Sequence, residues 1–262
     1  MHVTVFKVIF YNMIKIKNLC VKFKTLTILN DISLEILPGS TMGLVGESGS
    51  GKTTLGRSIL LLNKISSGHV YYKDTELTPS NISKYRADMQ MVFQDPYASI
   101  DPKMKTSKVI AEPLLITGKI TSPAMIKSKV DDLLCLVGLS PAHGNKLIHE
   151  FSGGQRQRVA IARALATSPE FIIWDESVSA LDVSVKAQII NLISRLQKEL
   201  GLTYLFISHD LPVVRHLCDD IAVLEHGKIV EKGRCDKVCF NPEHEYTKRL
   251  VASVLTRKKT HT

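Results

Sequence analysis

The stretch 46–53, GESGSGKT, restricts the possible folds of this chain more than any other. It fits G-x-x-x-x-G-K-[ST], a loop whose glycine N–H groups turn inward around phosphate oxygens. The apolar run 41–45 before it predicts a buried strand, and 54–62 after it predicts a helix, with Leu55, Ile59 and Leu62 at helical spacing. Strand, loop and helix in this order predict a nucleotide site in an α/β fold.

The loop residues have separate predicted roles at a triphosphate. Lys52 is placed to reach the β- and γ-phosphates, and the Thr53 hydroxyl to coordinate Mg²⁺. The remaining residues expected to bind the nucleotide are Gly46, Glu47, Ser48, Gly49, Ser50, Gly51 and Thr54. The alternative is a glycine- and serine-rich turn that happens to precede a lysine, and the flanking strand and helix patterns argue against it.

Three apolar strand patterns end in polar side chains. Gln94 follows the strand predicted at 89–93, where it could reach a metal ion and the attacking water. Asp175 and Glu176 end the strand at 171–176 and point to opposite sides, one toward Mg²⁺ and one toward a water molecule. His209 follows the strand at 203–207 and could meet the γ-phosphate. Taken singly, such a Gln or His is more often loop polarity or structure.

A second phosphate-compatible element lies about a hundred residues after the first. Phe151 precedes a helix start, SGGQ, where a serine and exposed glycine N–H groups form an anion site. Its residues are Ser152, Gly153, Gly154 and Gln155. An ordinary helix cap with a glycine turn explains this pentapeptide equally well on its own. Because no strand pattern intervenes, we expect a helical insertion at about 95–165 between two strands of one sheet.

Within this insertion, the pattern predicts a helix at 106–117 that Pro113 interrupts, and a helix at 123–137 with Ser122 as N-cap. Later segments predict a helix at 183–200 capped by Asp182, a hairpin at 221–231 and a last helix at 242–255. Strands are expected from Met13 and at 28–36. Residues 1–12 are expected to be a non-native or disordered extension.

Composition limits the other classes of function. With 262 residues, 44% of them apolar, the chain can form one large domain or a domain with a subdomain. No apolar run reaches the roughly 18 residues of a membrane span. The net charge of +9 permits nucleic-acid binding, but no RNA-binding signature or basic heptad region accompanies it, so we expect no nucleic acid partner.

The five cysteines and the absence of a secretory signal favour a reducing, cytosolic setting. Cys235, Cys239 and His244 do not complete a four-ligand metal site, so we expect the two cysteines to act as small buried hydrophobes.

Taken together, these elements resemble the nucleotide-binding subunits of ABC transporters over about residues 14–255. The matching motifs, in family order, are GESGSGKT, Gln94, FSGGQ at 151–155, FIIWDE at 171–176, SALD at 179–182 and His209. The resemblance implies a RecA-like P-loop NTPase core with an N-terminal antiparallel β subdomain and an inserted α-helical subdomain at about 95–165. It assigns 13–255 to the ATPase domain and 236–262 to a C-terminal tail.

The resemblance also implies roles for single residues, with ATP and Mg²⁺ as cofactors. Thr53, Gln94 and Asp175 would serve Mg²⁺, while Glu176, with His209, Lys52 and Gln94, would act in hydrolysis. Residues 152–155 would act on the nucleotide of a second ATPase subunit in a head-to-tail dimer, and Asp182 would couple the two sites. Phe23 would stack on adenine, although an ordinary core aromatic is an equal alternative.

A narrower resemblance is to the peptide and nickel importers, carried by MVFQDPYASIDP at 91–102, ESVSALDVS at 176–184 and NPEHEYTKRL at 241–250. Trp174 and Ser177 depart from the common pattern. The short tail favours a nickel or metallophore system without excluding peptides. The expected partners are transmembrane permeases, a second ATPase subunit and an extracellular substrate-binding protein, with this chain peripheral on the cytoplasmic face of the membrane.

Three rival interpretations remain at this point. The first is a soluble ABC ATPase that acts on nucleic acid or ribosomes, the second is an exporter subunit, and the third is a degenerate partner that binds ATP without hydrolysing it. The sequence contains neither a second cassette nor a long coiled-coil insertion, which argues against the first. The tail motif argues against the second, and intact Glu176, His209 and FSGGQ argue against the third.

Overall fold

The structure is a computed structural model that describes residues 11–94, 100–118, 120–179 and 181–259. Most of the expected extension at 1–12 and the middle of the 91–102 motif lie outside these ranges. None of the helices in the described ranges combines the length and the apolar character that a bilayer span requires.

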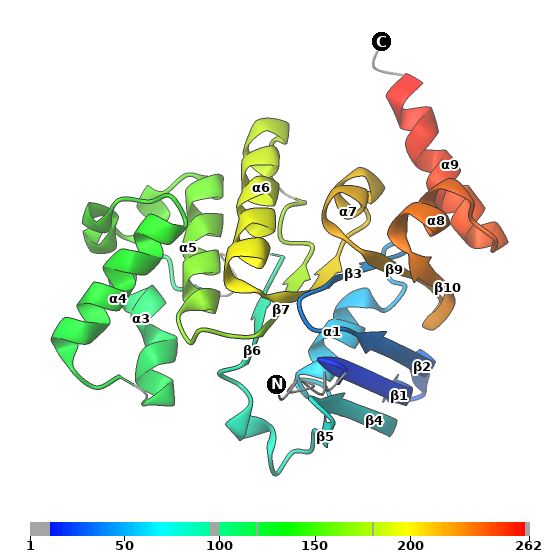
Figure 1. Cartoon of the computed structure of the whole chain (residues 1–262), viewed down its shortest axis with the longest axis horizontal. Coiled ribbons are helices and arrows are strands. Elements are labelled where there is room, and N and C mark those ends of the chain that lie inside the picture. The colour runs from blue at the N-terminus through cyan, green and yellow to red at the C-terminus, as the bar shows by residue number, and fades with distance from the viewer. Residues whose placement is uncertain (1–10, 95–99, 119, 180, 260–262) are drawn as a thin grey trace, which may run out of the picture.

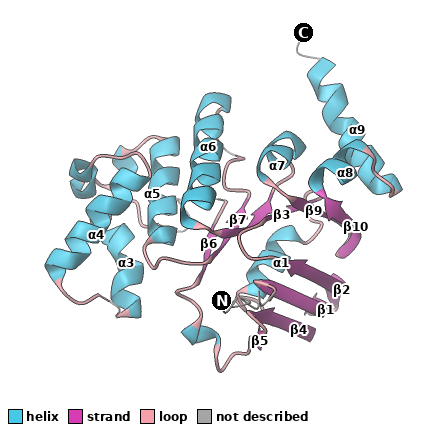
Figure 2. Ribbon diagram, in the orientation of Figure 1, coloured by secondary structure: helices cyan, strands magenta, loops and turns pink. Residues whose placement is uncertain are grey.

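A largely parallel six-stranded sheet forms the centre of the molecule (Figures 1 and 2). Its order is β10-β9-β3-β8-β7-β6, and only β10 runs antiparallel to its neighbour. The strands are β3 (Thr41–Val45), β6 (Met89–Val92), β7 (Phe171–Asp175), β8 (Thr203–Ile207), β9 (Asp220–Glu225) and β10 (Lys228–Arg234). Every residue of β3, β7 and β8 is buried, as expected for parallel strands covered on both faces.

The alternation of side chains along β7 divides the core into two clusters. Phe171 and Ile173 pack with the small sheet and the helix after the phosphate loop, α1 (Lys52–Ile59). Ile172 and Trp174 face the other helices. Leu62 does not join this core as predicted, because α1 ends at Ile59 and the Leu62 side chain is exposed.

A second, antiparallel sheet has the order β2-β1-β4-β5 and lies on the α1 side of the central sheet (Figure 1). Its strands are β1 (Ile14–Phe23), β2 (Leu26–Ile36), β4 (Ser67–Tyr72) and β5 (Thr75–Glu76). Ile14, Ile16 and Val21 are buried on its inner face, as their alternation predicted. Phe23 departs from this alternation, since its side chain is 49% exposed.

The chain between β6 and β7 is mainly helical. Its helices are α3 (Thr106–Thr117), α4 (Pro123–Leu136) and α5 (Gly153–Leu165), with short 3-10 turns at Ile82–Lys84, Pro141–Asn145 and Ile148–Glu150 in and before this region. The predicted break at Pro113 is wrong, because α3 continues through this residue. Val109, Ile110 and Leu114 of α3 are buried, and this packing compensates for the hydrogen bond that proline cannot donate. Ser122 is the N-cap of α4, but its hydroxyl makes no capping bond.

The last third contains α6 (Val183–Leu200), α7 (Leu211–Leu217), α8 (Cys235–Phe240) and α9 (Glu245–Lys259). Helices α7 and α8 were not predicted from the sequence, and α9 begins three residues later than predicted. Cys235 and Cys239 are buried neighbours, with their sulfurs 4.0 Å apart. Their burial agrees with the interpretation of both residues as small buried hydrophobes.

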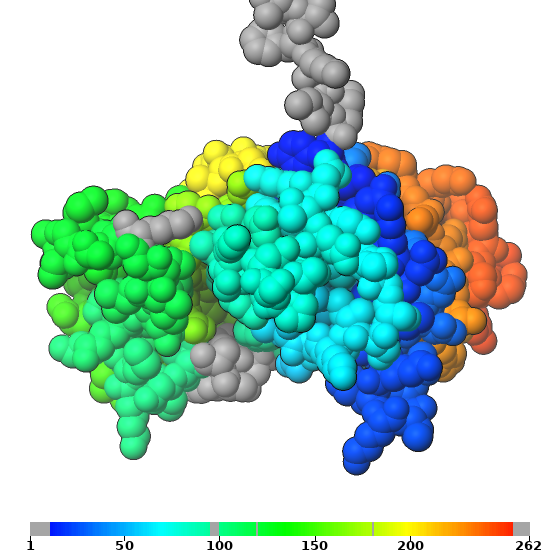
Figure 3. All heavy atoms as spheres, turned by 90° about the horizontal axis from the view of Figure 1, so that it is seen from below, coloured from blue at the N-terminus to red at the C-terminus, as the bar shows by residue number. Residues whose placement is uncertain are grey.

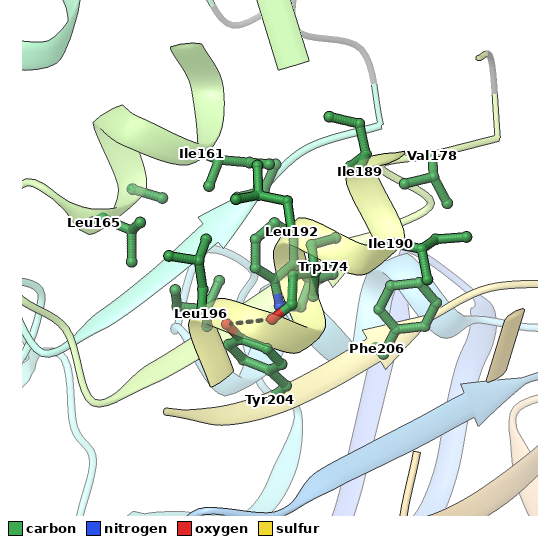
Figure 4. Packing of buried hydrophobic residues seen from close by; sticks show 14 of the residues in the cluster. Ile161, Leu165, Trp174, Val178, Ile189, Ile190, Leu192, Leu196, Tyr204 and Phe206 are labelled. Atoms are coloured by element: carbon green, nitrogen blue, oxygen red, sulfur yellow. Dashed lines mark hydrogen bonds between the residues drawn. The ribbon is translucent and has the colours of Figure 1, made fainter. Parts of the chain in front are cut away.

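Trp174 is the central residue of the larger core cluster (Figure 4). Its side chain is fully buried, and its ring meets the Tyr204 ring edge to face with centroids 5.3 Å apart. The Tyr204 hydroxyl donates to the carbonyl of Ile193 in α6 at 3.4 Å. Trp174, the bulky residue before Asp175 and Glu176, therefore connects the central sheet to α6 through its contact with Tyr204.

We predict that Trp174→Ala lowers the free energy of unfolding by about 3–5 kcal/mol, because it leaves a large cavity in a close-packed core. Urea unfolding followed by circular dichroism measures the change. The control is Leu115→Ala, which truncates a side chain that is 61% exposed on α3 and should change the free energy by less than about 0.5 kcal/mol. Equal stability of the Trp174 variant and the wild type would contradict this packing.

Candidate nucleotide-binding site

The phosphate loop follows the carboxyl end of β3 and depends on glycine where neighbouring backbone approaches it. A Cβ atom on Gly46 would lie 2.2 Å from the Leu224 carbonyl oxygen of β9. Gly51 has φ +108°, and a Cβ there would lie 2.9 Å from a methyl group of Leu29. These positions exclude larger residues for steric reasons, independent of any bound phosphate.

Backbone hydrogen bonds hold the loop from outside. The Gly227 N–H, in the turn between β9 and β10, donates to the Ser50 carbonyl at 3.0 Å, and the Gly227 carbonyl accepts from Asn30 of β2 at 2.8 Å. The Glu47 N–H donates to the Tyr246 hydroxyl of α9 at 2.8 Å. This role of Tyr246 was not predicted from the sequence, where its one signal was its position in the 241–250 motif.

Lys52 is almost fully buried, with 4% of its surface exposed. Its ammonium donates to the carbonyls of Gly46 at 2.9 Å and Glu47 at 2.8 Å, and lies 3.8 Å from the Glu176 carboxylate. Burial lowers the pKa of Lys52, and the carboxylates of Glu176 and Asp175 oppose this shift. The loop therefore holds a poorly hydrated cation, which favours an anion beside it.

Asp175 lies at the end of β7 and is also buried, with 3% of its surface exposed. Its carboxylate accepts a hydrogen bond from the Thr53 hydroxyl at 2.9 Å. Burial raises the pKa of Asp175, and the Thr53 hydrogen bond partly offsets this shift. A hydroxyl and a buried carboxylate beside a phosphate loop fit Mg²⁺, which takes oxygen ligands from one or two side chains and from substrate phosphates.

Glu176 is the point at which three strand ends converge. One of its carboxylate oxygens lies 3.5 Å from the Gln94 amide nitrogen, after β6, and 3.4 Å from His209 Nδ1, after β8. Glu176 has φ +45°, and its N–H donates to the Ile207 carbonyl at 3.0 Å. The structure thus brings together Gln94, Glu176 and His209 next to Lys52, as the strand-end pattern predicted.

Other predicted residues lie elsewhere on the chain. Ser152 and Gln155 cap α5 reciprocally: the serine hydroxyl accepts from the Gln155 N–H at 3.4 Å, and the Gln155 side chain accepts from the Ser152 N–H at 3.1 Å. A Cβ on Gly154 would lie 2.4 Å from a methyl group of Val185 in α6. In the described residues, no hydrogen bond or ion pair joins 152–155 to the phosphate loop, and α5 lies apart from α1 (Figure 1).

Asp182 and Phe23 are also outside the cluster around Lys52. Asp182 is the N-cap of α6, and its carboxylate accepts from the Val185 N–H and the Ser184 hydroxyl, each at 2.9 Å. These hydrogen bonds lower the pKa of Asp182, and the bond from the Val185 N–H has the largest effect. Phe23 pairs with Leu26 at the end of β1, and in the described part of the chain no contact joins it to the loop.

Comparison with known proteins agrees with this arrangement. The family model described as ABC transporter matches residues 29–179. An oligopeptide transport ATP-binding protein of Bacillus subtilis is 47% identical over 234 residues, which are 88% of this chain and 77% of that protein. A dipeptide transport ATP-binding protein of Lactococcus lactis is 47% identical over 231 residues, 86% of this chain and 74% of that protein.

Among solved structures, the chain is similar to a bacterial ABC transporter cassette solved as a dimer. The TM-score is 0.77 at 30% identity, and the match covers 85% of this chain and 99% of that chain. The expected fold, a P-loop NTPase core with an antiparallel β subdomain and a helical insertion, is confirmed by these neighbours and by the two sheets. The family model, the relatives and the phosphate loop together show that this chain belongs to the ABC transporter family of ATP-binding proteins and is an ATPase.

Proposed function

We propose that the chain hydrolyses ATP to energise an importer of peptides through separate membrane permeases. The observation that supports this most strongly is the cluster around the phosphate loop, in which the buried Lys52 ammonium lies 3.8 Å from the Glu176 carboxylate and the Thr53 hydroxyl donates to Asp175 at 2.9 Å. Such a set of a buried cation and two acids is costly to bury without an anionic ligand and a cation to serve.

In this proposal, each side chain has one task in the in-line attack of water on the γ-phosphate. Lys52 moves from its loop carbonyls to the β- and γ-phosphates and balances their charge. Glu176 orients the attacking water. Gln94 and His209 hold the Glu176 carboxylate in position and lie on the side of the site where the γ-phosphate binds. When bound, Mg²⁺ neutralises phosphate charge, and Thr53, Asp175 and Gln94 are the residues that would hold it.

The site is completed, in this account, by a second ATPase subunit. The FSGGQ turn offers a capped helix start whose Ser152 and Gly153 are exposed, and the loop of its own chain does not occupy it. A head-to-tail dimer would place this turn on the nucleotide held by the partner's phosphate loop, with Asp182 between the two sites. Phe23, half exposed at a hairpin end, would offer its ring to adenine.

The cargo proposal rests on the relatives. Those described above are named for oligopeptide and dipeptide transport, so we propose peptides rather than nickel, which the short tail had favoured. The partners would be permeases, a second ATPase subunit and an extracellular substrate-binding protein, with this chain on the cytoplasmic face of the membrane. The helical region, drawn in green beside the cyan β4–β6 region in Figure 3, would be the surface that contacts the permeases.

We predict that Glu176→Gln retains ATP binding and forms a persistent dimer with ATP. Its hydrolysis rate should fall about 10²–10⁴-fold, because the carboxylate that orients the attacking water is gone. Phosphate release and size-exclusion chromatography measure these effects. The control Glu199→Gln changes the same group on the exposed side of α6, where the carboxylate lies 3.6 Å from the Arg195 guanidinium, and should retain both properties. Hydrolysis at the wild-type rate in the Glu176 variant would exclude the assigned role.

We predict that Lys52→Ala instead weakens ATP binding itself, by about ten- to a hundredfold, because it removes charge-assisted hydrogen bonds to the phosphates. Titration calorimetry with ATP measures this change. Lys198→Ala, which removes an exposed ammonium from the last turn of α6, is the control and should bind as the wild type does. An unchanged affinity in the Lys52 variant would contradict the loop assignment.

We predict that cells lacking this chain lose uptake of a labelled oligopeptide and regain it with the wild type but not with Glu176→Gln. Nickel uptake, measured in the same cells, should stay unchanged. Loss of nickel uptake with normal peptide uptake would refute the peptide proposal and favour a nickel system. Co-purification with ribosomes or nucleic acid, rather than with membrane proteins, would refute the transport role.

A further inference from the structure

The segment around the 241–250 motif contacts the phosphate loop, although the two are far apart in sequence. Tyr246 is the second residue of α9, and its side chain is 5% exposed. Its hydroxyl oxygen accepts the Glu47 N–H at 2.8 Å, a contact between residues 199 positions apart. A buried phenol oxygen placed on a loop N–H is a specific polar contact and not packing alone.

The same peptide group is also held from its other side. The Glu47 N–H and the Gly46 carbonyl belong to one planar peptide unit, and that carbonyl accepts a hydrogen bond from the Lys52 ammonium at 2.9 Å. Tyr246 and Lys52 therefore fix the two polar ends of one unit. Because the unit is planar, holding its N–H also fixes where its carbonyl points, and so where the ammonium of Lys52 rests.

The 241–250 motif positions Tyr246 by anchoring the chain just before it. The Glu231 carboxylate, on β10, accepts the N–H groups of Glu243 at 2.9 Å and His244 at 3.0 Å. His244 Nδ1 in turn accepts the Tyr246 N–H at 3.2 Å. These three hydrogen bonds thus connect β10, at the edge of the central sheet, to Tyr246, which contacts the phosphate loop.

A second anchor ties α9 to the neighbouring strand. The Arg249 guanidinium lies 3.5 Å from the carboxylate of Glu225, which ends β9, and 5.9 Å from the centre of the Tyr246 ring. The turn after β9 contacts the phosphate loop directly, through the Gly227 N–H and the Ser50 carbonyl. The C-terminal segment, the β9–β10 hairpin and the loop are therefore one hydrogen-bonded unit.

We propose that Tyr246 is a positioning residue for the phosphate loop, so that docking of the 241–250 segment and binding of ATP stabilise each other. This inference rests on the proposed ATP site at Lys52. Removal of the Tyr246 hydroxyl leaves the Glu47 N–H without its side-chain partner, and the Gly46–Glu47 peptide unit can rotate. Coupling between two binding events is reciprocal. In the wild type, bound ATP therefore stabilises docking of the 241–250 segment by the same free energy by which docking of this segment stabilises ATP binding.

The test compares two Tyr→Phe variants of the full-length chain. Each variant removes one buried hydroxyl that forms a hydrogen bond with a backbone group. Tyr246→Phe should weaken ATP binding about three- to tenfold and raise the KM of hydrolysis with little change in kcat. The control Tyr204→Phe loses its bond to the Ile193 carbonyl, remote from the loop, and should keep the wild-type affinity. Thermal unfolding of both variants measures any general loss of stability.

Hydrogen exchange provides the readout that a purely structural role would not change. ATP should slow amide exchange in residues 243–251 of the wild type, and this slowing should be lost in Tyr246→Phe at ATP concentrations that saturate both proteins. Equal ATP affinity in Tyr246→Phe and the wild type, or equal slowing in both, would overturn the proposal while leaving the ATP site intact. A wild type that binds no ATP would instead overturn the proposed function.

Discussion

The buried ammonium of Lys52 is the constraint on which the site depends. An isolated cation at this depth would lose much of its hydration energy, so it needs oxygen atoms around it. The loop supplies two carbonyls, and the strand ends supply the carboxylates of Asp175 and Glu176. Glycines at 46 and 51 allow the backbone to curve closely enough, because neighbouring strands leave no room for side chains there.

This arrangement follows from the parallel sheet. The carboxyl ends of β3, β6, β7 and β8 lie at one edge, so residues far apart in sequence, such as Thr53 and Asp175 at 122 positions and Gln94 and Glu176 at 82, meet around one loop. The sheet is rigid because both faces are packed, one against α1 and the antiparallel sheet and the other against α5, α6 and α7. The FSGGQ turn at the start of α5, which we propose as a second anion site, is held on a different part of the molecule. This separation is the physical reason for proposing a composite site between two chains.

Much of this architecture could be predicted from local sequence patterns. The strand runs before 46, 94, 175 and 209 are short, apolar and followed by polar side chains, so these strands and the cluster of Gln94, Glu176 and His209 at their ends were predicted correctly. The capping residues Ser152 and Asp182 were also correct, because N-caps depend on local hydrogen bonds.

Predictions failed where tertiary packing decides. Pro113 lies inside a continuous helix because buried neighbours on α3 outweigh the lost backbone bond, and Leu62 is exposed because α1 ends early. The contact between Tyr246 and Glu47 has no local signal, since it depends on how the last helix docks on β9 and β10. Phe23 illustrates the same limit, because its expected alternative as a core aromatic does not hold where the end of the β1–β2 hairpin leaves its side chain half exposed.

We propose that each ATP is held by the phosphate loop of one subunit and the FSGGQ turn of another. The most direct measurement is an experimental structure of the ATPase assembly with ATP and Mg²⁺ bound. We expect the Ser152 hydroxyl and the N–H groups of 153–155 to contact the γ-phosphate of the nucleotide on the opposite subunit's Lys52. A nucleotide-bound assembly in which this turn faces solvent in every copy, and the γ-phosphate contacts one chain only, would contradict the account.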